Sequence, residues 1–172
     1  MKTKVLLTMC VVFVWGLLSL ANAQVKAGSA EDKAFQKIDS ESSPDGKITL
    51  LLAFEKDFAQ SPALRDALLQ LVQLYQQKND SPKVIEYSEK VLKVDPANLV
   101  ALLTATRAYS MDGKQASIDR AIQYGTKAET EIGKLKGSPP QQGYTDDQWK
   151  EYINSNAELA KNYLSYAKAL KR

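Results

Sequence analysis

The stretch that decides the fold is 65–98, RDALLQLVQLYQQKNDSPKVIEYSEKVLKVDPAN. In its first half, Leu68, Leu71, Leu74 and Tyr75 recur at the three- and four-residue spacing that puts side chains on one face of an α-helix. The polar turn and the serine–proline pair that follow predict the end of this helix and the start of another, because a hydroxyl caps a helix and proline suits its first position. The stretch therefore predicts two helices joined by a short turn.

The same pattern returns further along the chain. The tetrapeptide VIEY at 84–87 recurs 37 residues later as AIQY at 121–124, and three first-helix positions recur 34 residues later. These first-helix matches are Leu68 with Leu102, Leu71 with Ala105, and Tyr75 with Tyr109. A period near 34 residues carried by helix–turn–helix units indicates stacked repeats. Tyr75, Tyr87, Tyr109 and Tyr124 are expected to pack between helices, because they occupy repeated positions.

These features resemble the tetratricopeptide repeat, a helix–turn–helix family with a similar period. The unit at 65–98 has residues at the family's signature positions: Leu68 for its tryptophan, Leu71 for its leucine, Tyr75 for its tyrosine, Val84 for its alanine, Ser88 for its large aromatic, and Pro96 for its closing proline. The unit at 99–132 departs from the pattern, since its turn is three residues longer and no proline closes it. The resemblance implies an all-α solenoid of about three helix pairs plus a C-terminal capping helix.

Helix-start and helix-stop signals extend the helical prediction over nearly the whole chain. Serine–proline pairs at 43–44, 61–62 and 81–82 predict three starts, Asp95-Pro96 predicts a fourth, and Thr145 opens a capping-box pattern. We expect helices at 30–38, 44–59, 62–77, 82–93, 97–112, 116–135 and 146–170. Residues 24–29 are expected to form a flexible lead-in, and 30–172 a single helical-repeat domain.

The N-terminus has the three parts of an export signal. Two lysines precede an uncharged run from 5 to 20, and Ala21-Asn22-Ala23 has the small–x–small form of a cleavage site. Residues 1–23 are therefore predicted to be a signal peptide, which leaves a periplasmic or secreted protein. The alternative is an uncleaved, tilted segment that anchors the protein in the membrane, although the run is short for a spanning helix.

Composition excludes several classes of chemistry. The chain has 172 residues, 23 Lys and Arg against 20 Asp and Glu, no histidine, and one cysteine, Cys10, which lies in the leader. The predicted mature protein therefore lacks histidine-based catalysis, ordinary zinc and haem ligands, iron–sulfur ligands and disulfides. We expect no catalytic residue, no metal and no cofactor. The near-neutral charge gives no electrostatic case for nucleic-acid binding.

The remaining candidate for function is a surface. In tetratricopeptide solenoids the first helix of each pair lines a groove, so the resemblance implies a partner-binding set made of Leu69, Gln70, Gln73, Gln77, Leu103, Thr104, Arg107 and Met111. These residues are expected to lie off the packing faces of their helices. Amide, guanidinium and aliphatic groups together suit another protein or an extended peptide.

The sequence thus predicts a non-enzymatic binding scaffold of the bacterial periplasm or cell envelope. Two alternatives remain open. A retained leader would make the protein a membrane-tethered structural component of the envelope, and membrane contact is expected in that case alone. A carboxylate-based hydrolase, acting for example on a glycan, would require two acids close together in a cleft.

Overall fold

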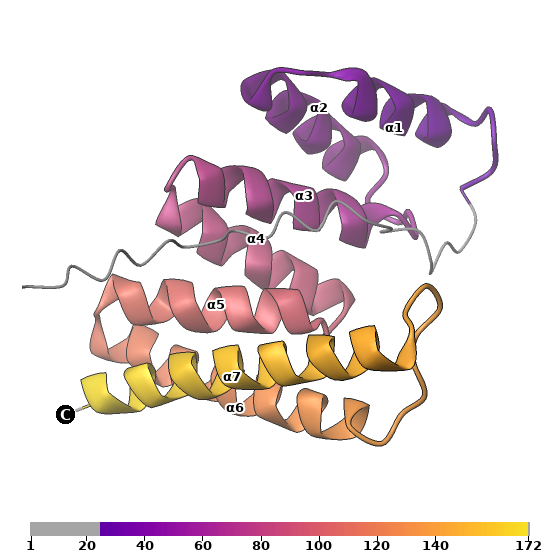
Figure 1. The fold of residues 1–172 in the computed structure, drawn as a ribbon. Coiled ribbons are helices and arrows are strands. Elements are labelled where there is room, and N and C mark those ends of the chain that lie inside the picture. The colour runs from indigo at the N-terminus through magenta and orange to yellow at the C-terminus, as the bar shows by residue number, and fades with distance from the viewer. Residues whose placement is uncertain (1–24, 172) are drawn as a thin grey trace, which may run out of the picture.

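The computed structural model describes residues 25–171, and within this part the chain is entirely helical, without a strand. Figure 1 shows the order of the helices along the chain. Their bounds are α1 Ala30–Ser40, α2 Pro44–Asp57, α3 Leu64–Gln77, α4 Ser81–Val94, α5 Leu99–Asp112, α6 Gln115–Leu135 and α7 Asp146–Leu170. The expected all-α class is therefore confirmed, and each of the seven expected helices is present.

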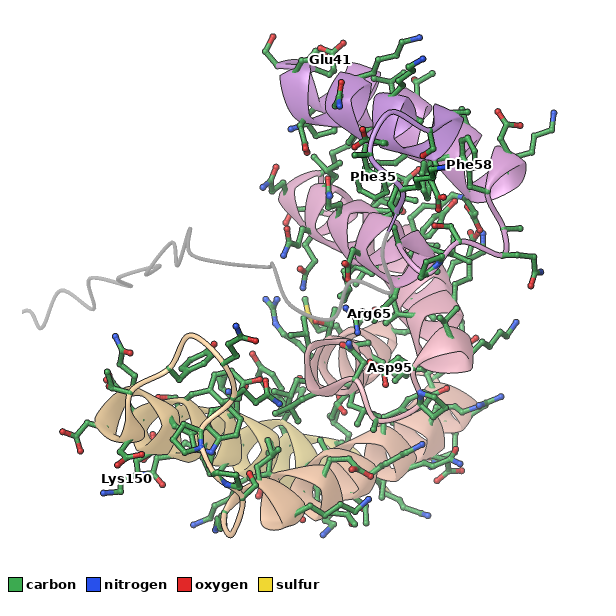
Figure 2. The ribbon with its side chains drawn as sticks, turned by 90° about the vertical axis from the view of Figure 1, so that its right-hand side faces the viewer. Phe35, Glu41, Phe58, Arg65, Asp95 and Lys150 are labelled. Carbon is green, nitrogen blue, oxygen red and sulfur yellow. The ribbon has the colours of Figure 1, made fainter. Side chains whose placement is uncertain are left out.

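Each helix packs against the next one in the chain, from α1 to α7, and α7 also packs against α5. This is the arrangement of a repeat-like stack of antiparallel helices. In Figure 2 the stack bends, so that the pair α6 and α7 points away to one side of the pairs before it. The long helix α7 covers α5 and α6 at the C-terminal end.

Two of the predicted helix starts are shifted by local hydrogen bonds. Ser43 caps α2 as expected, accepting from the amide of Gly46 at 3.3 Å. Ser61 instead accepts from the amide of Ala63 at 2.9 Å, which forms a turn and delays α3. At α4 the cap is Asp80 rather than the serine after it, because its carboxylate reaches the amide of Lys83 at 3.1 Å.

The start of α5 also differs from the prediction, whereas that of α7 matches it. The side chain of Asp95 stabilises a turn instead. Its carboxylate accepts hydrogen bonds from the backbone amide of Ala97 at 3.3 Å and from Asn98 Nδ2 at 3.1 Å. The cap is then Asn98, which accepts from the amide of Ala101 at 3.1 Å. At α7 both hydrogen bonds of the capping box at Thr145 are present. Asparagine and aspartate both cap helices well, so which of them does so depends on the local turn.

The repeated apolar positions form the core. Leu68, Leu71, Leu102 and Ala105 are almost completely buried. One cluster of buried residues joins α1 to α4 with the small residues of α5, and Val25 of the expected lead-in packs against it. A second cluster joins α5, α6 and α7. Leu92 of α4 packs against both clusters, as expected when each unit helps to complete the core of its neighbour.

The repeated tyrosines pack as stacked pairs. The rings of Tyr75 and Tyr87 lie 5.3 Å apart between centroids, and those of Tyr109 and Tyr124 lie 5.9 Å apart. Tyr75 is buried, whereas Tyr109 is half-buried, with its hydroxyl donating to Glu89 at 2.7 Å. The second pair thus combines ring packing with a polar contact at the surface.

The predicted signal peptide at 1–23 lies outside the described residues. Of the helices in 25–171, none combines the length and the apolar character that a membrane crossing requires.

Candidate functional site

The residues predicted to form a groove lie on α3 and α5. Gln73 and Gln77 on α3 are exposed, and so is Arg107 on α5. Met111, one turn after Arg107, is 61% exposed, which is unusual for a large apolar side chain. The half-buried members of the set are Gln70 and Thr104.

Two members of the predicted set are core residues instead. Leu69 is 8% exposed and belongs to the cluster that includes Ala101 and Ala108 of α5. Leu103 is 6% exposed and belongs to the cluster that includes Trp149 of α7. The expectation that both leucines lie off the packing faces is therefore wrong. A helix between two neighbours buries side chains on more than one face, and helical periodicity does not show this.

Three of the predicted residues meet at a small cavity between α5 and the α3–α4 turn. Its volume is about 60 Å³, and its lining residues are Gln76, Asn79, Ser81, Val84, Thr104, Arg107, Ala108 and Met111. Small-molecule pockets usually measure ~300 Å³ or more. This cavity is therefore much smaller than an ordinary small-molecule pocket.

Three polar residues of this cavity were missed by sequence reasoning: Gln76, Asn79 and Ser81. Asn79 has a φ of +55°, a left-handed conformation that asparagine tolerates and that ends a helix. The signal was present in the sequence, because the polar turn at 76–80 lies at the end of the first helix of the pair. The predicted partner-binding set nevertheless included residues of the helices alone and none of this turn.

A second, larger cavity lies between α4, α5 and α6 and was not predicted. Its volume is about 380 Å³, and its lining residues are Glu89, Leu92, Lys93, Leu102, Arg120, Tyr124 and Lys127. Glu89 Oε1 accepts from the hydroxyls of Tyr109 at 2.7 Å and Tyr124 at 3.1 Å. Burial and the hydrogen bond to Glu89 both raise the pKa of Tyr109. Burial and the charge of Glu89 also raise the pKa of Tyr124, so both tyrosine hydroxyls remain hydrogen-bond donors at neutral pH.

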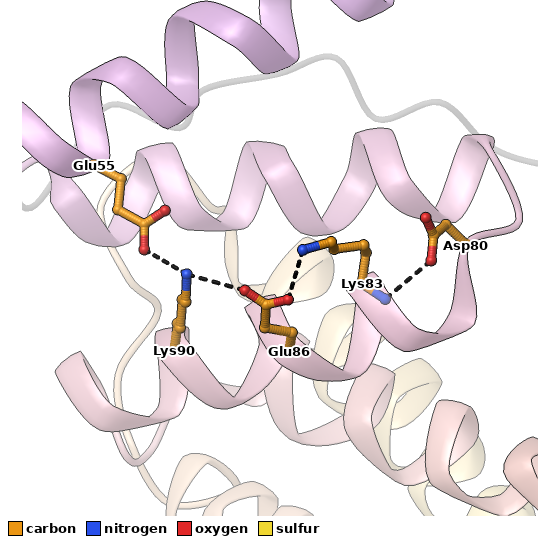
Figure 3. A network of polar contacts seen from close by, with 5 residues as sticks. All are labelled: Glu55, Asp80, Lys83, Glu86 and Lys90. Carbon is orange, nitrogen blue, oxygen red and sulfur yellow. Dashed lines mark hydrogen bonds and ion pairs between the residues drawn. The ribbon is translucent and has the colours of Figure 1, made fainter.

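A charged network joins α2 to α4 (Figure 3). Lys90 Nζ lies 2.7 Å from Glu55 and 3.2 Å from Glu86, and Lys83 Nζ lies 2.8 Å from Glu86. The hydrogen bond from Lys83 is the main cause that lowers the pKa of Glu86. Burial alone would lower the pKa of Lys90, but its contacts with the two glutamates outweigh burial and raise it. The network links consecutive helix pairs.

No group of three or more metal-ligating side chains that could hold an ion occurs in 25–171. The larger cavity contains one carboxylate, Glu89, and the smaller one contains none. Neither of these two cavities therefore has the pair of acids that a carboxylate-based hydrolase would require, and that function stays an untested prediction.

Comparison with models of known protein families finds no match, and comparison with curated proteins finds no similar sequence. The chain is therefore classified by its architecture, which is all-α and repeat-like in the described residues.

Proposed function

We propose that the protein is a non-enzymatic scaffold that binds a segment of another protein, or an extended peptide, across α3 and α5. The helix pairs at 65–98 and 99–132 are then tetratricopeptide-like repeats, and α3 and α5 are their first helices. The observation that carries the proposal is the grouping of exposed Arg107 and Met111 at one cavity with the amides of Gln76 and Asn79.

The chemistry of this group suits a peptide. Amide side chains both donate and accept hydrogen bonds, as a peptide backbone requires, and a guanidinium adds a donor for carbonyl or carboxylate oxygens. Methionine supplies an adaptable apolar contact, which is common at surfaces that bind varied partners. Gln73 and Gln77 extend the polar surface along α3 beyond the cavity. The binding surface of this proposal omits Leu69 and Leu103, because both are buried.

The test is capture of partners by the purified protein from envelope extract, followed by binding measurements with each partner identified. Arg107→Ala should weaken binding most, since arginine often contributes strongly to interfaces, and Gln73→Ala should weaken it less. Lys161→Ala on α7 is the matched control, because Lys161 is an exposed cation that does not line the cavity. Equal binding by the control and by the Arg107→Ala, Gln73→Ala double variant would reject this surface.

We also propose that the protein acts in the bacterial periplasm or cell envelope, after cleavage behind Ala23. The support is the order of charged, apolar and small residues at 1–23. Intact-mass measurement of the exported form should give a chain that begins at Gln24. A chain that still carries 1–23 in the membrane fraction would instead support the membrane-tethered alternative.

A further inference from the structure

Successive helix pairs carry equivalent charged residues on their second helices, α2, α4 and α6. We compare two sets of these residues. The first set has a glutamate on α2 and two cations on α4, and the second has a glutamate on α4 and two cations on α6. The equivalent cations are Lys83 with Arg120 and Lys90 with Lys127, each 37 positions apart. Each cation pair also contacts a glutamate of the preceding second helix, Glu55 through Lys90 and Glu89 through Arg120. The two sets can therefore be compared charge by charge.

The charges of the first set are balanced. Lys90 contacts both Glu55 and Glu86, and Lys83 contacts Glu86, as Figure 3 shows. Two ammonium groups thus meet two carboxylates. Glu86 is the second acid of this set, and it lies between the two lysines on the same face of α4.

The charges of the second set are not balanced. Gln123 stands 37 positions after Glu86, so the second acid is replaced by a neutral amide. Glu89 lies 3.8 Å from Arg120 Nη1, and it also accepts hydrogen bonds from two tyrosines. Lys127 forms no ion pair with any other residue of 25–171. Positive charge is therefore left without a partner at this position.

The unbalanced charge lies at the larger cavity. Arg120, Lys127 and also Lys93 line it, against the single carboxylate of Glu89. Its volume of about 380 Å³ falls within the range of ordinary ligand pockets. Leu92 and Leu102 add apolar lining, and Leu102 is fully buried and so lies at the base.

We propose that this cavity binds a carboxylate attached to an apolar body. In the first set the two cations hold a carboxylate of the chain itself, Glu86, which lies one helical turn from each of them. Two cations seven residues apart, or two turns, on a second helix therefore suit a carboxylate between them. Guanidinium and ammonium groups form charge-assisted hydrogen bonds with carboxylates. The leucines and the ring of Tyr124 contact the rest of the ligand. The carboxylate comes either from an acidic side chain of a protein partner or from a free organic acid. The site does not depend on the surface of α3 and α5.

The experiment is a titration of the isotope-labelled protein, followed by amide chemical shifts, with 3-phenylpropionate as the free acid and an acetylated, amidated Phe-Glu-Phe tripeptide as the acidic segment. We expect saturable shifts in α4 and α6 around Lys93 and Lys127. Saturation by phenylpropionate identifies a free-acid site, and saturation by the peptide alone identifies a partner's side chain. Inorganic phosphate at equal ionic strength should bind more weakly than either, because it has no apolar body.

Variants at exposed positions make the test specific. Gln123→Glu restores the acid that Glu86 supplies in the first set, so it should weaken binding by up to about fivefold, the factor that corresponds to ~1 kcal/mol for an exposed ion pair. Gln123→Ala is its neutral control and should bind normally. Lys127→Gln should also weaken binding about fivefold. Lys134→Gln on the same helix should not, because Lys134 pairs with Glu131 and does not line the cavity.

Three results would overturn the proposal. They are the absence of saturable shifts with both organic probes, phosphate binding as tight as theirs, and unchanged binding by Gln123→Glu. Circular dichroism of each variant checks that the fold is intact, which is expected because Gln123 and Lys127 are exposed. Loss of peptide binding in Arg107→Ala with normal carboxylate binding at this cavity would separate the two sites.

Discussion

The two glycines of α6 offer a matched test of how tightly α5, α6 and α7 pack. A Cβ at Gly125 would lie 3.1 Å from Thr106 Cγ2 and 3.1 Å from Leu164 Cδ1, whereas a Cβ at Gly133 would meet nothing within 4 Å. Both glycines lie inside the same helix. Substitution to alanine reduces the entropy of the unfolded backbone at both positions, so packing is the main difference between them.

The magnitudes follow from these contacts. Alanine stabilises a helix interior by about 0.5–1 kcal/mol relative to glycine, so Gly133→Ala should raise the free energy of unfolding by that amount. At Gly125 an added methyl in a packed core costs about 1–3 kcal/mol. The neighbours have little room to give, because Thr106 is fully buried with its hydroxyl bonded to the carbonyl of Leu102 at 2.7 Å. Gly125→Ala should therefore be neutral to about 2 kcal/mol less stable than the parent.

Urea unfolding followed by far-ultraviolet circular dichroism measures the difference directly. The helix-propensity contributions largely cancel between the two variants, so their free energies of unfolding should differ by about 1–3 kcal/mol. With a slope of ~2 kcal/mol per molar urea, each 1 kcal/mol moves the midpoint by about 0.5 M. Equal stabilisation by Gly125→Ala and Gly133→Ala would refute the close packing of α6 against α5 and α7.

Three further predictions concern the contacts that hold the stack together. Because the hydrogen bond from Lys83 lowers the pKa of Glu86 in the folded state, this carboxylate contributes stability above its ordinary pKa and loses it as the pH falls through the lowered value. Glu86→Gln should therefore be less stable than the parent at pH 7, and the difference should vanish in acid, as urea unfolding at several pH values will show; a constant difference would contradict this. Tyr75→Ala should lower the free energy of unfolding by about 3–5 kcal/mol. Tyr109→Phe should cost about 0.5–1.5 kcal/mol for the hydrogen bond to Glu89, and no measurable loss would rule out a stabilising role for that bond.

The sequence by itself determined the helices and their order, because helix formation depends on neighbours a few residues away. The spacing of Leu68, Leu71 and Tyr75 defines a buried face, and the capping box at Thr145 depends on residues within one turn. Where several capping residues stand close together, local pattern was insufficient. Asp95 and Asn98 are both good caps, and their mutual hydrogen bond decides which of them begins the helix.

The tertiary structure alone decided which surfaces remain open. Leu103 satisfies the pattern of an exposed residue on α5, but α7 packs against α5 from a distant part of the chain and buries it. No sequence pattern indicated a role for Glu89, yet its carboxylate accepts hydrogen bonds from tyrosine hydroxyls on both α5 and α6. The cavity beside it exists because α4, α5 and α6 converge there. Burial and charge compensation depend on contacts between helices, and residue spacing within one helix contains no information about what its neighbours cover.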